Sequence, residues 1–192
     1  MYGQTEASPR MSYLPHVDSI TKLGSIGIPI PGGKFSLIDE EKKNISKPNI
    51  EGELVYEGKN VSMGYAKSGP DLSKDDENNG ILYTGDIARK DIDGYYFITG
   101  RKKRFIKLFG NRINLDETET LVKKIVLECA CYGEDDKMII CIEEENKTKD
   151  VKDYISKQLG INSLAFKVKY IQEIPKNSSG KILYKNLGKI WN

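Results

Sequence analysis

The chain has 192 residues, of which 30 are basic and 28 acidic, so its formal net charge at pH 7 is +2. This near balance argues against a nucleic-acid-binding domain, which needs a basic excess or a basic face. The length allows one ordinary domain or two small ones, and no apolar run approaches the roughly 20 residues of a membrane-spanning helix. The expected partner is therefore a small molecule or another protein.

The cysteines support neither a disulfide framework nor a zinc site. They are odd in number, have no CxxC spacing, and the one histidine, His16, lies far off in sequence. We expect Cys129, Cys131 and Cys141 to be small core residues, with the first two on one face of a strand. His16 is expected in a loop, without a catalytic role. The N-terminus lacks the layout of a signal peptide, which predicts a cytoplasmic protein.

Glycine and proline punctuate the first half of the chain, with short apolar runs between the turns. Such spacing predicts an antiparallel, barrel-like sheet. The runs are GSIGIPIPGG (24–33), KFSLID (34–39), EGELVYEG (51–58), GILYTGDIARKD (80–91) and DGYYFITGR (93–101). The polar stretch SGPDLSKDDENNG is expected to be a surface loop.

The second half predicts a small α+β domain, so the fold class expected for the whole chain is α+β. FIKLFGNRINL (105–115) predicts two short strands joined at residues 109–111, because Gly followed by Asn suits the positive φ of a tight hairpin. KMIICIEEE (137–145) and AFKVKYIQEI (165–174) predict two further strands, and DVKDYISKQLG (150–160) predicts a helix that ends at Gly160.

A helix is also expected in LDETETLVKKIVLE (115–128). Asp116 is the predicted N-cap, with Glu119 three residues further on. The residues with helical spacing form its apolar face: Leu121, Val122, Ile125 and Val126. The joint between the two halves is expected close to residues 100–103.

Each motif is weak when it stands alone. YGQTE is compatible with a simple turn, YTGD with the end of a strand, and GRKKR with a solvated basic surface. The SSGK of PKNSSGKIL resembles the end of a phosphate-binding P-loop, but Pro175 stands where the P-loop glycine is required. A P-loop NTPase or a kinase-like protein is therefore set aside.

The order of the motifs is more informative than any one of them. YGQTE, GELVYEG, YTGD, DGYYFITGRKKRFIK with FGNRI, and PKNSSGKI follow one another along the chain. This series resembles the C-terminal part of the adenylate-forming (AMP-binding) superfamily, which includes acyl-CoA synthetases, peptide-synthetase adenylation domains and luciferase-like enzymes. The resemblance runs from Tyr2 to about Lys185. It implies that residues 1–101 are the last strip of the large domain, mainly its barrel-like subdomain, and that 102–192 are the mobile lid domain.

The resemblance implies a nucleotide site in the first part. Glu6 would bind Mg²⁺ and Thr5 would offer its hydroxyl to the α-phosphate. Asp86 would accept both hydroxyls of the ribose, and Arg101 would reach the same ribose or the phosphates, with an interdomain salt bridge as the alternative. Tyr2 would place its ring near the adenine, although a packed turn aromatic is an equally good interpretation.

In the second part the resemblance implies a moving lid. Lys103 falls on the hinge position, and Lys181 would enter the active site while the acyl-adenylate forms. The loop of Gly110, Asn111 and Arg112 would face the site in the thioester-forming pose, where small residues admit a pantetheine arm. The segment KKIVLECACYGEDDKMIICIEEE departs from the family, because it lacks the usual Gly-rich stretch before its strand.

The function implied is that of an ATP-dependent acid–thiol ligase. It would use ATP and Mg²⁺, form an acyl-adenylate with release of pyrophosphate, and pass the acyl group to CoA or to a phosphopantetheine carrier protein. The region that precedes YGxTE in the family, with its phosphate loop and most of the acid pocket, is expected as a missing partner, and without it the chain alone is expected to be inactive. The alternative is a truncated, non-catalytic module that binds a partner or regulates.

Overall fold

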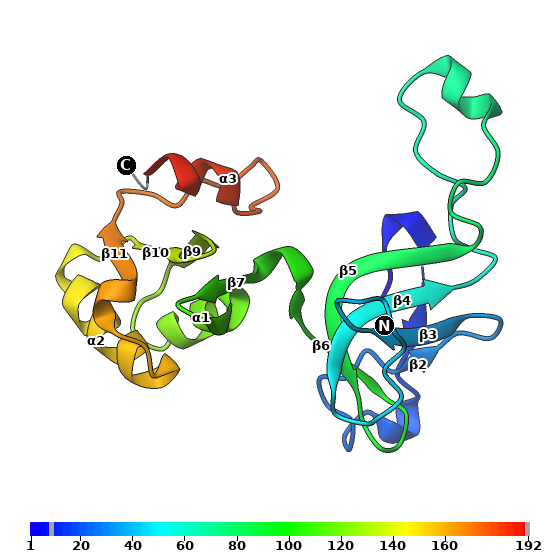
Figure 1. Cartoon of the computed structure of the whole chain (residues 1–192), viewed down its shortest axis with the longest axis horizontal. Helices are drawn as coiled ribbons and strands as arrows, with labels where there is room; N and C mark the ends of the chain where they lie inside the picture. Colours follow the sequence, from blue (N-terminus) through cyan, green and yellow to red (C-terminus); the bar gives the residue numbers. More distant parts are fainter. Residues whose placement is uncertain (8–9, 191–192) are drawn as a thin grey trace. The chain divides into compact units, whose positions relative to one another are not determined.

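The structure is a computed structural model that describes residues 1–7 and 10–190 (Figure 1). The chain divides into two compact units, Met1–Lys102 and Lys103–Asn192. The sequence places the boundary one residue earlier, between positions 101 and 102. Residues 8, 9, 191 and 192 belong to the two predicted domains and lie outside the described residues.

The first unit is built on an antiparallel sheet of four strands in the order β3-β4-β5-β6 (Figure 1). Their bounds are Lys34–Ile38, Glu51–Glu57, Ile81–Lys90 and Tyr96–Arg101. Two short strands, β1 (Ser12–Tyr13) and β2 (Ile28–Pro29), pair separately. The predicted barrel-like closure is not confirmed, because β3 and β6 are the edges of an open sheet and no sheet closes among the described residues. The antiparallel pairing itself is confirmed.

Aromatic packing organises the core of this unit. The Phe35 ring meets the rings of Tyr56 and Tyr96 edge to face, with centroids 5.5 and 5.1 Å apart. Ala7 and Met11 from the N-terminal segment are fully buried in the same cluster. This burial holds the N-terminal segment against the sheet, although the segment contributes little strand pairing of its own.

The polar stretch between β4 and β5 is exposed, as the sequence predicts. It contains a short 3₁₀ turn, Gly69–Ser73, whose first residues are capped by the side chains of Ser68 and Asp71. Figure 1 shows this segment, drawn in teal, extending away from the strands of its own unit.

The second unit contains a three-stranded sheet in the order β11-β10-β9. Strands β9 (Cys129–Glu134) and β10 (Lys137–Ile142) are antiparallel, whereas β10 and β11 (Phe166–Tyr170) are parallel and joined through helix α2 (Thr148–Leu159). A two-stranded hairpin, β7 (Phe105–Leu108) and β8 (Asn111–Asn114), precedes helix α1 (Leu115–Val122). The chain is thus mixed α/β with antiparallel sheets in both units.

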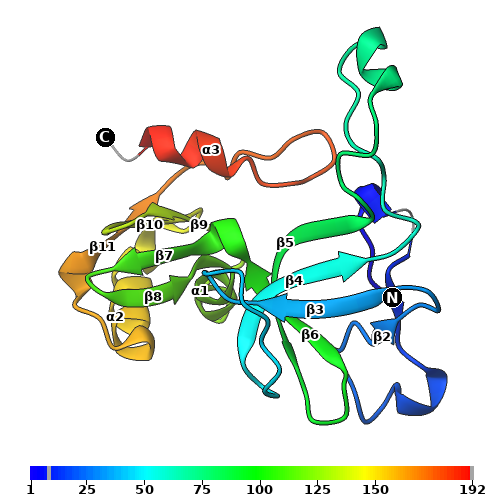
Figure 2. The same cartoon turned by 45° about the vertical axis from the view of Figure 1, so that its right-hand side comes forward.

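Both faces of this sheet are buried. One face packs with the β7–β8 hairpin, α1 and α2, and the other packs with the C-terminal segment that contains α3 (Tyr184–Leu187) (Figure 2). Cys129 and Cys131 lie in the first core and Cys141 in the second, each without exposed surface. The prediction that the cysteines are core residues is confirmed. Burial raises the pKa of Cys129 to about 12 and that of Cys141 to about 11.

Two local predictions about the second unit are wrong in detail. The hairpin turn is formed by Phe109 (φ 49°) and Gly110 (φ 82°), whereas Asn111 is already in β8. The N-cap of α1 is Asn114, whose side-chain oxygen accepts from the backbone N–H groups of Asp116 and Glu117. Asp116 instead pairs with Arg104.

The helix predicted in residues 115–128 is shorter in the structure, whereas the second predicted helix agrees with it. Helix α1 ends at Val122, so Ile125 and Val126 follow in a turn, yet both pack in the core that the apolar spacing predicts. Helix α2 ends at Leu159, and Gly160, with φ 64°, is its C-terminal cap.

The capping role of Asn114 gives a test of this local structure. Asn114→Ala is expected to lower the free energy of unfolding by about 1 kcal/mol, because two N–H groups at the start of α1 lose their acceptor. Urea unfolding followed by circular dichroism measures the change. Asn114→Asp, which keeps a capping oxygen, is the control, and equal destabilisation by both variants would contradict the assignment.

Candidate functional site

A β-bulge presents Asp86 to the candidate site. The pairing of β4 with β5 shifts register between Glu53 and Val55, opposite the Thr84-Gly85-Asp86 segment. Gly85 has φ 70°, a conformation that glycine adopts without strain. The Thr84 hydroxyl donates to Leu54 O at 2.7 Å and accepts from the Asp86 backbone N–H at 3.1 Å. The YTGD motif is therefore a local distortion that turns one carboxylate inward.

The N-terminal motif holds one oxygen of this carboxylate. The Tyr2 hydroxyl donates to Asp86 Oδ2 at 2.5 Å, and the Gln4 side-chain nitrogen lies 3.0 Å from the same oxygen. Gln4 also lies 3.0 Å from Thr84 O, so its two hydrogens can reach both acceptors. Asp86 itself is only 1 % exposed. A buried carboxylate needs such donors, since desolvating it without them is costly.

The second oxygen of Asp86 is differently placed. Asp86 Oδ1 lies 2.6 Å from Arg101 Nε, yet it is buried and accepts no hydrogen bond of suitable geometry among the described residues. The Arg101 side chain is 61 % exposed. An unused acceptor beside a movable cation is suited to a ligand that brings hydroxyl donors. The Arg101 ion pair lies within the first unit.

Tyr2 combines the two interpretations that the sequence left open. Its ring packs edge to face on Phe35, with centroids 6.3 Å apart, while its hydroxyl binds Asp86. Burial, with the neighbouring Asp86 carboxylate, raises the pKa of Tyr2 above its ordinary value of 10.0. Tyr2 is thus a packed residue with a polar tip in the site, and a contact with adenine stays a prediction.

Thr5 and Glu6 lie on the 3₁₀ turn Thr5–Ala7 that follows Gln4. The backbone N–H of Ser62 donates to Glu6 O at 2.7 Å, which ties the turn to the loop after β4. The hydroxyl of Tyr65 donates to the Glu6 carboxylate and lowers its pKa. Glu6 is partly exposed and ionised, as a metal ligand must be. The described residues contain no group of three or more His, Cys, Asp or Glu side chains that could hold a metal.

Lys181 lies in the second unit on a hairpin whose arms meet at the Lys176–Ile182 bridge. The Asn177 side-chain oxygen accepts from the backbone N–H groups of Ser179 and Lys181, and Gly180 has φ 77°. The Lys181 side chain is exposed. The local sequence thus builds a hydrogen-bonded turn that presents a lysine to solvent.

The other hairpin, β7–β8, carries Gly110, Asn111 and Arg112. Its apolar residues pack in the core on the sheet face opposite the Lys181 segment. The Arg112 guanidinium lies over the Phe105 ring at 4.3 Å. Asp135 and Asp136 accept from the backbone N–H groups of Lys107 and Phe109. These bonds fix the hairpin.

Sequence reasoning did not identify Gln4, Thr84 or Asp136 as parts of these sites. Gln4 and Thr84 lie inside the motifs YGQTE and YTGD, so the motifs themselves were the available signal. Asp136 lies in none of the motifs. It is in the turn between β9 and β10, and it reaches the β7–β8 hairpin only once these strands have folded. Lys103, the predicted hinge, is the first residue of the second unit.

Comparison with known proteins places the chain in a family. The AMP-binding enzyme profile matches residues 1–66. The chain is 31% identical to a long-chain-fatty-acid–CoA ligase of Salmonella typhimurium over 196 residues, which cover 97% of the chain and 34% of the relative. It is 34% identical to an oxalate–CoA ligase of Arabidopsis thaliana over 193 residues, covering 94% and 37%. The chain belongs to the AMP-binding superfamily.

Solved structures of the superfamily share this fold. The o-succinylbenzoate CoA synthetase of Bacillus subtilis, in complex with its acyl-adenylate intermediate, matches with a TM-score of 0.74 at 23% identity, covering 97% of this chain and 40% of that one. The same enzyme with ATP and magnesium ion gives a TM-score of 0.73 at 24% identity, with the same coverage. At these identities the likeness shows the fold alone.

The chain spans about a third of the length of these superfamily ligases. Among residues 1–7 and 10–190, no helix is both long and apolar enough to cross a membrane.

The Tyr2–Asp86 bond predicts a specific pH dependence. The pKa of Tyr2 is higher in the folded chain than its ordinary value of 10.0. The bond between Tyr2 and Asp86 therefore stabilises the folded chain fully below pH 10.0, and this stabilisation decreases as the pH rises above 10.0. Tyr2→Phe is expected to cost about 2 kcal/mol at pH 8, the usual range for a hydrogen bond to a charged group, and less at about pH 11.

Urea unfolding at the two pH values measures this difference. Tyr13→Phe removes a more exposed hydroxyl from the same unit and is the control, expected to change stability little at either pH. A penalty for Tyr2→Phe that stays constant across the range would contradict the bond.

Proposed function

We propose that the chain is the C-terminal part of an ATP-dependent acid–thiol ligase. In the first reaction a carboxylate oxygen attacks the α-phosphorus of ATP, and the bond to the leaving pyrophosphate breaks. In the second reaction a thiol sulfur attacks the acyl carbon, and AMP leaves. Both reactions shift negative charge, so fixed donors and cations carry most of the catalysis.

The environment of Asp86 is the observation that carries this proposal. Its Oδ2 is fixed by Tyr2 and Gln4, while its buried Oδ1 has an ion pair but no well-formed hydrogen bond. A vicinal diol supplies the hydroxyl donors that such an oxygen accepts. Ribose is the diol common to ATP, the acyl-adenylate and AMP. Arg101, exposed beside this carboxylate, is then available to the ribose or to phosphate oxygens.

Magnesium fits the first unit on chemical grounds. Mg²⁺ is commonly held by one or two carboxylates together with substrate phosphates, and Glu6 is a partly exposed carboxylate with a lowered pKa. When bound, the ion would neutralise phosphate charge. The Thr5 hydroxyl on the same turn would orient the α-phosphate, and Tyr65 would hold the Glu6 side chain.

The second unit would act as the lid, with Lys103 as its hinge. Lys181 would stabilise the charge that develops between the carboxylate and the α-phosphate. The Gly110-Asn111-Arg112 turn would admit the pantetheine arm of CoA or of a carrier protein. The two hairpins pack on opposite faces of one sheet, which supports the use of a different face in each reaction. Three buried, reduced cysteines fit a cytoplasmic location.

The proposal predicts that the chain binds an acyl-adenylate through Asp86. Asp86→Asn keeps the shape of the side chain but removes the charge, and it is expected to lower affinity for an acyl-sulfamate analogue of the adenylate by about tenfold or more. Isothermal titration calorimetry measures the affinity. Lys181→Ala is expected to leave this affinity unchanged.

Asp91→Asn is the matched control, since Asp91 lies just beyond β5 and pairs at 2.8 Å with Lys22, which is not a residue of the candidate site. ATP–pyrophosphate exchange with a panel of carboxylic acids, with Mg²⁺ present, completes the test. We expect no exchange by the chain alone, because the phosphate loop of the family precedes the YGQTE motif. Failure of the wild-type chain to bind the analogue would favour a non-catalytic module instead.

A further inference from the structure

Arg104 is a largely buried arginine directly after the predicted hinge residue. Its side chain is only 12% exposed, although it follows the basic residues Lys102 and Lys103 in a short 3₁₀ turn. A surface interpretation of GRKKR therefore does not apply to this residue. A buried guanidinium is stable only where carboxylates or carbonyl oxygens satisfy it.

Three acceptors on two elements of the second unit satisfy Arg104. Its Nε donates to Asp116 Oδ1 at 2.7 Å and its Nη2 to Glu119 Oε1 at 2.5 Å, both on α1. Its Nη1 donates to the backbone oxygen of Cys131 in β9 at 2.7 Å. Burial lowers the pKa of Arg104, but the bond to Asp116 and the charge of Glu119 outweigh it and raise the pKa overall.

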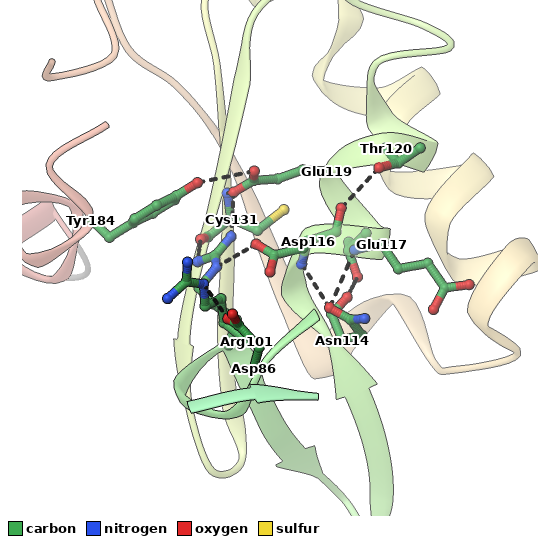
Figure 3. A network of polar contacts seen from close by, with 11 residues as sticks. Asp86, Arg101, Asn114, Asp116, Glu117, Glu119, Thr120, Cys131 and Tyr184 are labelled. Carbon is green, nitrogen blue, oxygen red and sulfur yellow. Dashed lines mark hydrogen bonds and ion pairs between the residues drawn. The ribbon is translucent and has the colours of Figure 1, made fainter. Parts of the chain in front are cut away.

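The fourth contact reaches the C-terminal segment. The Arg104 guanidinium lies 3.9 Å from the centre of the Tyr184 ring. The Tyr184 hydroxyl donates to Glu119 Oε2 at 3.2 Å, and Figure 3 shows Tyr184 pointing toward Glu119. Glu119 also accepts from the Cys131 N–H at 2.7 Å. The ring and the two carboxylates therefore enclose the guanidinium.

Tyr184 begins α3, three residues after Lys181. The backbone N–H of Leu183 donates to Pro175 O at 2.8 Å, which closes the base of the hairpin that carries Lys181. A short path thus leads from the hinge to the lysine. It runs from Arg104 to the Tyr184 ring and then to the adjacent Leu183 at the hairpin base.

We propose that Arg104 is a positioning residue for Lys181, which rests on the function proposed above. It fastens the first residues beyond the hinge to the base of the lysine hairpin, so that rotation at the hinge carries the hairpin with it. The planar guanidinium suits this role because it binds three acceptors and a ring at once. The ammonium of a lysine is a compact point charge and lacks the planar fork of donors that reaches these separate partners.

Hydrogen exchange of the whole chain tests the connection without substrate. The amides of Gly180, Lys181 and Leu183 are bonded within the hairpin and are the reporters. Arg104→Lys and Tyr184→Leu are each expected to speed their exchange by about tenfold or more, while the amides of α2 stay unchanged. Tyr184→Phe keeps the ring and is expected to retain most of the protection.

Lys176→Gln is the matched control, because Lys176 lies on the same hairpin and the change removes only its surface ion pair with Glu128, just before β9. We expect wild-type exchange from it. Unchanged hairpin exchange in both Arg104→Lys and Tyr184→Leu would overturn the proposal. So would equal acceleration in α2, which indicates general destabilisation, or a loss in Tyr184→Phe as large as that in Tyr184→Leu.

A kinetic measurement separates positioning from simple support of the fold. In the enzyme reconstituted from this chain and the region expected to precede it, Arg104→Lys is expected to lower kcat for ATP–pyrophosphate exchange about tenfold with KM for ATP unchanged. A rise in KM with unchanged kcat would overturn the role. An inactive wild-type enzyme would count against the proposed function, whereas the exchange experiment still decides the connection.

Discussion

The hydrogen bond between Tyr2 and Asp86 is the contact on which the first unit's site depends. It joins residues 84 positions apart in the chain, and so brings the N-terminal motif to the bulge in β5. The carboxylate is buried by the aromatic core and held by donors on one side only, which leaves its other oxygen with acceptor capacity. Together with the burial of Ala7 and Met11, this bond fixes the N-terminal segment against the sheet and leaves Asp86 Oδ1 as the acceptor of the candidate site.

Local signals explain which parts of the fold the sequence predicts well. The short strands of the first unit, helix α2 with its Gly160 cap, and the buried cysteines follow from turn residues, periodicity and side-chain type. Non-local packing explains the failures. Asp116 has the chemistry of an N-cap, but Arg104 takes its carboxylate and Asn114 caps the helix instead. Whether a sheet closes depends on contacts between its edges, which strand patterns do not encode.

The candidate site shows the same division between local signals, which the sequence reveals, and non-local contacts, which it does not. The motif series identified Tyr2, Asp86 and Arg101, which do meet in the structure. It gave no role to Gln4 or Arg104, because their importance arises from partners far away in the sequence. In the second unit, one sheet with two buried faces supports two separate hairpins. Each hairpin therefore packs on a core of its own, while both belong to one compact unit.

The burial of the cysteines has a practical consequence for testing motion at the proposed hinge. All three lack exposed surface and have raised pKa values, so little reactive thiolate is present in the folded chain at neutral pH. Spectroscopic labels could therefore be attached to new surface cysteines, one in each unit, with the native thiols left in place. Distances between such labels would then report the distribution of interdomain orientations in solution.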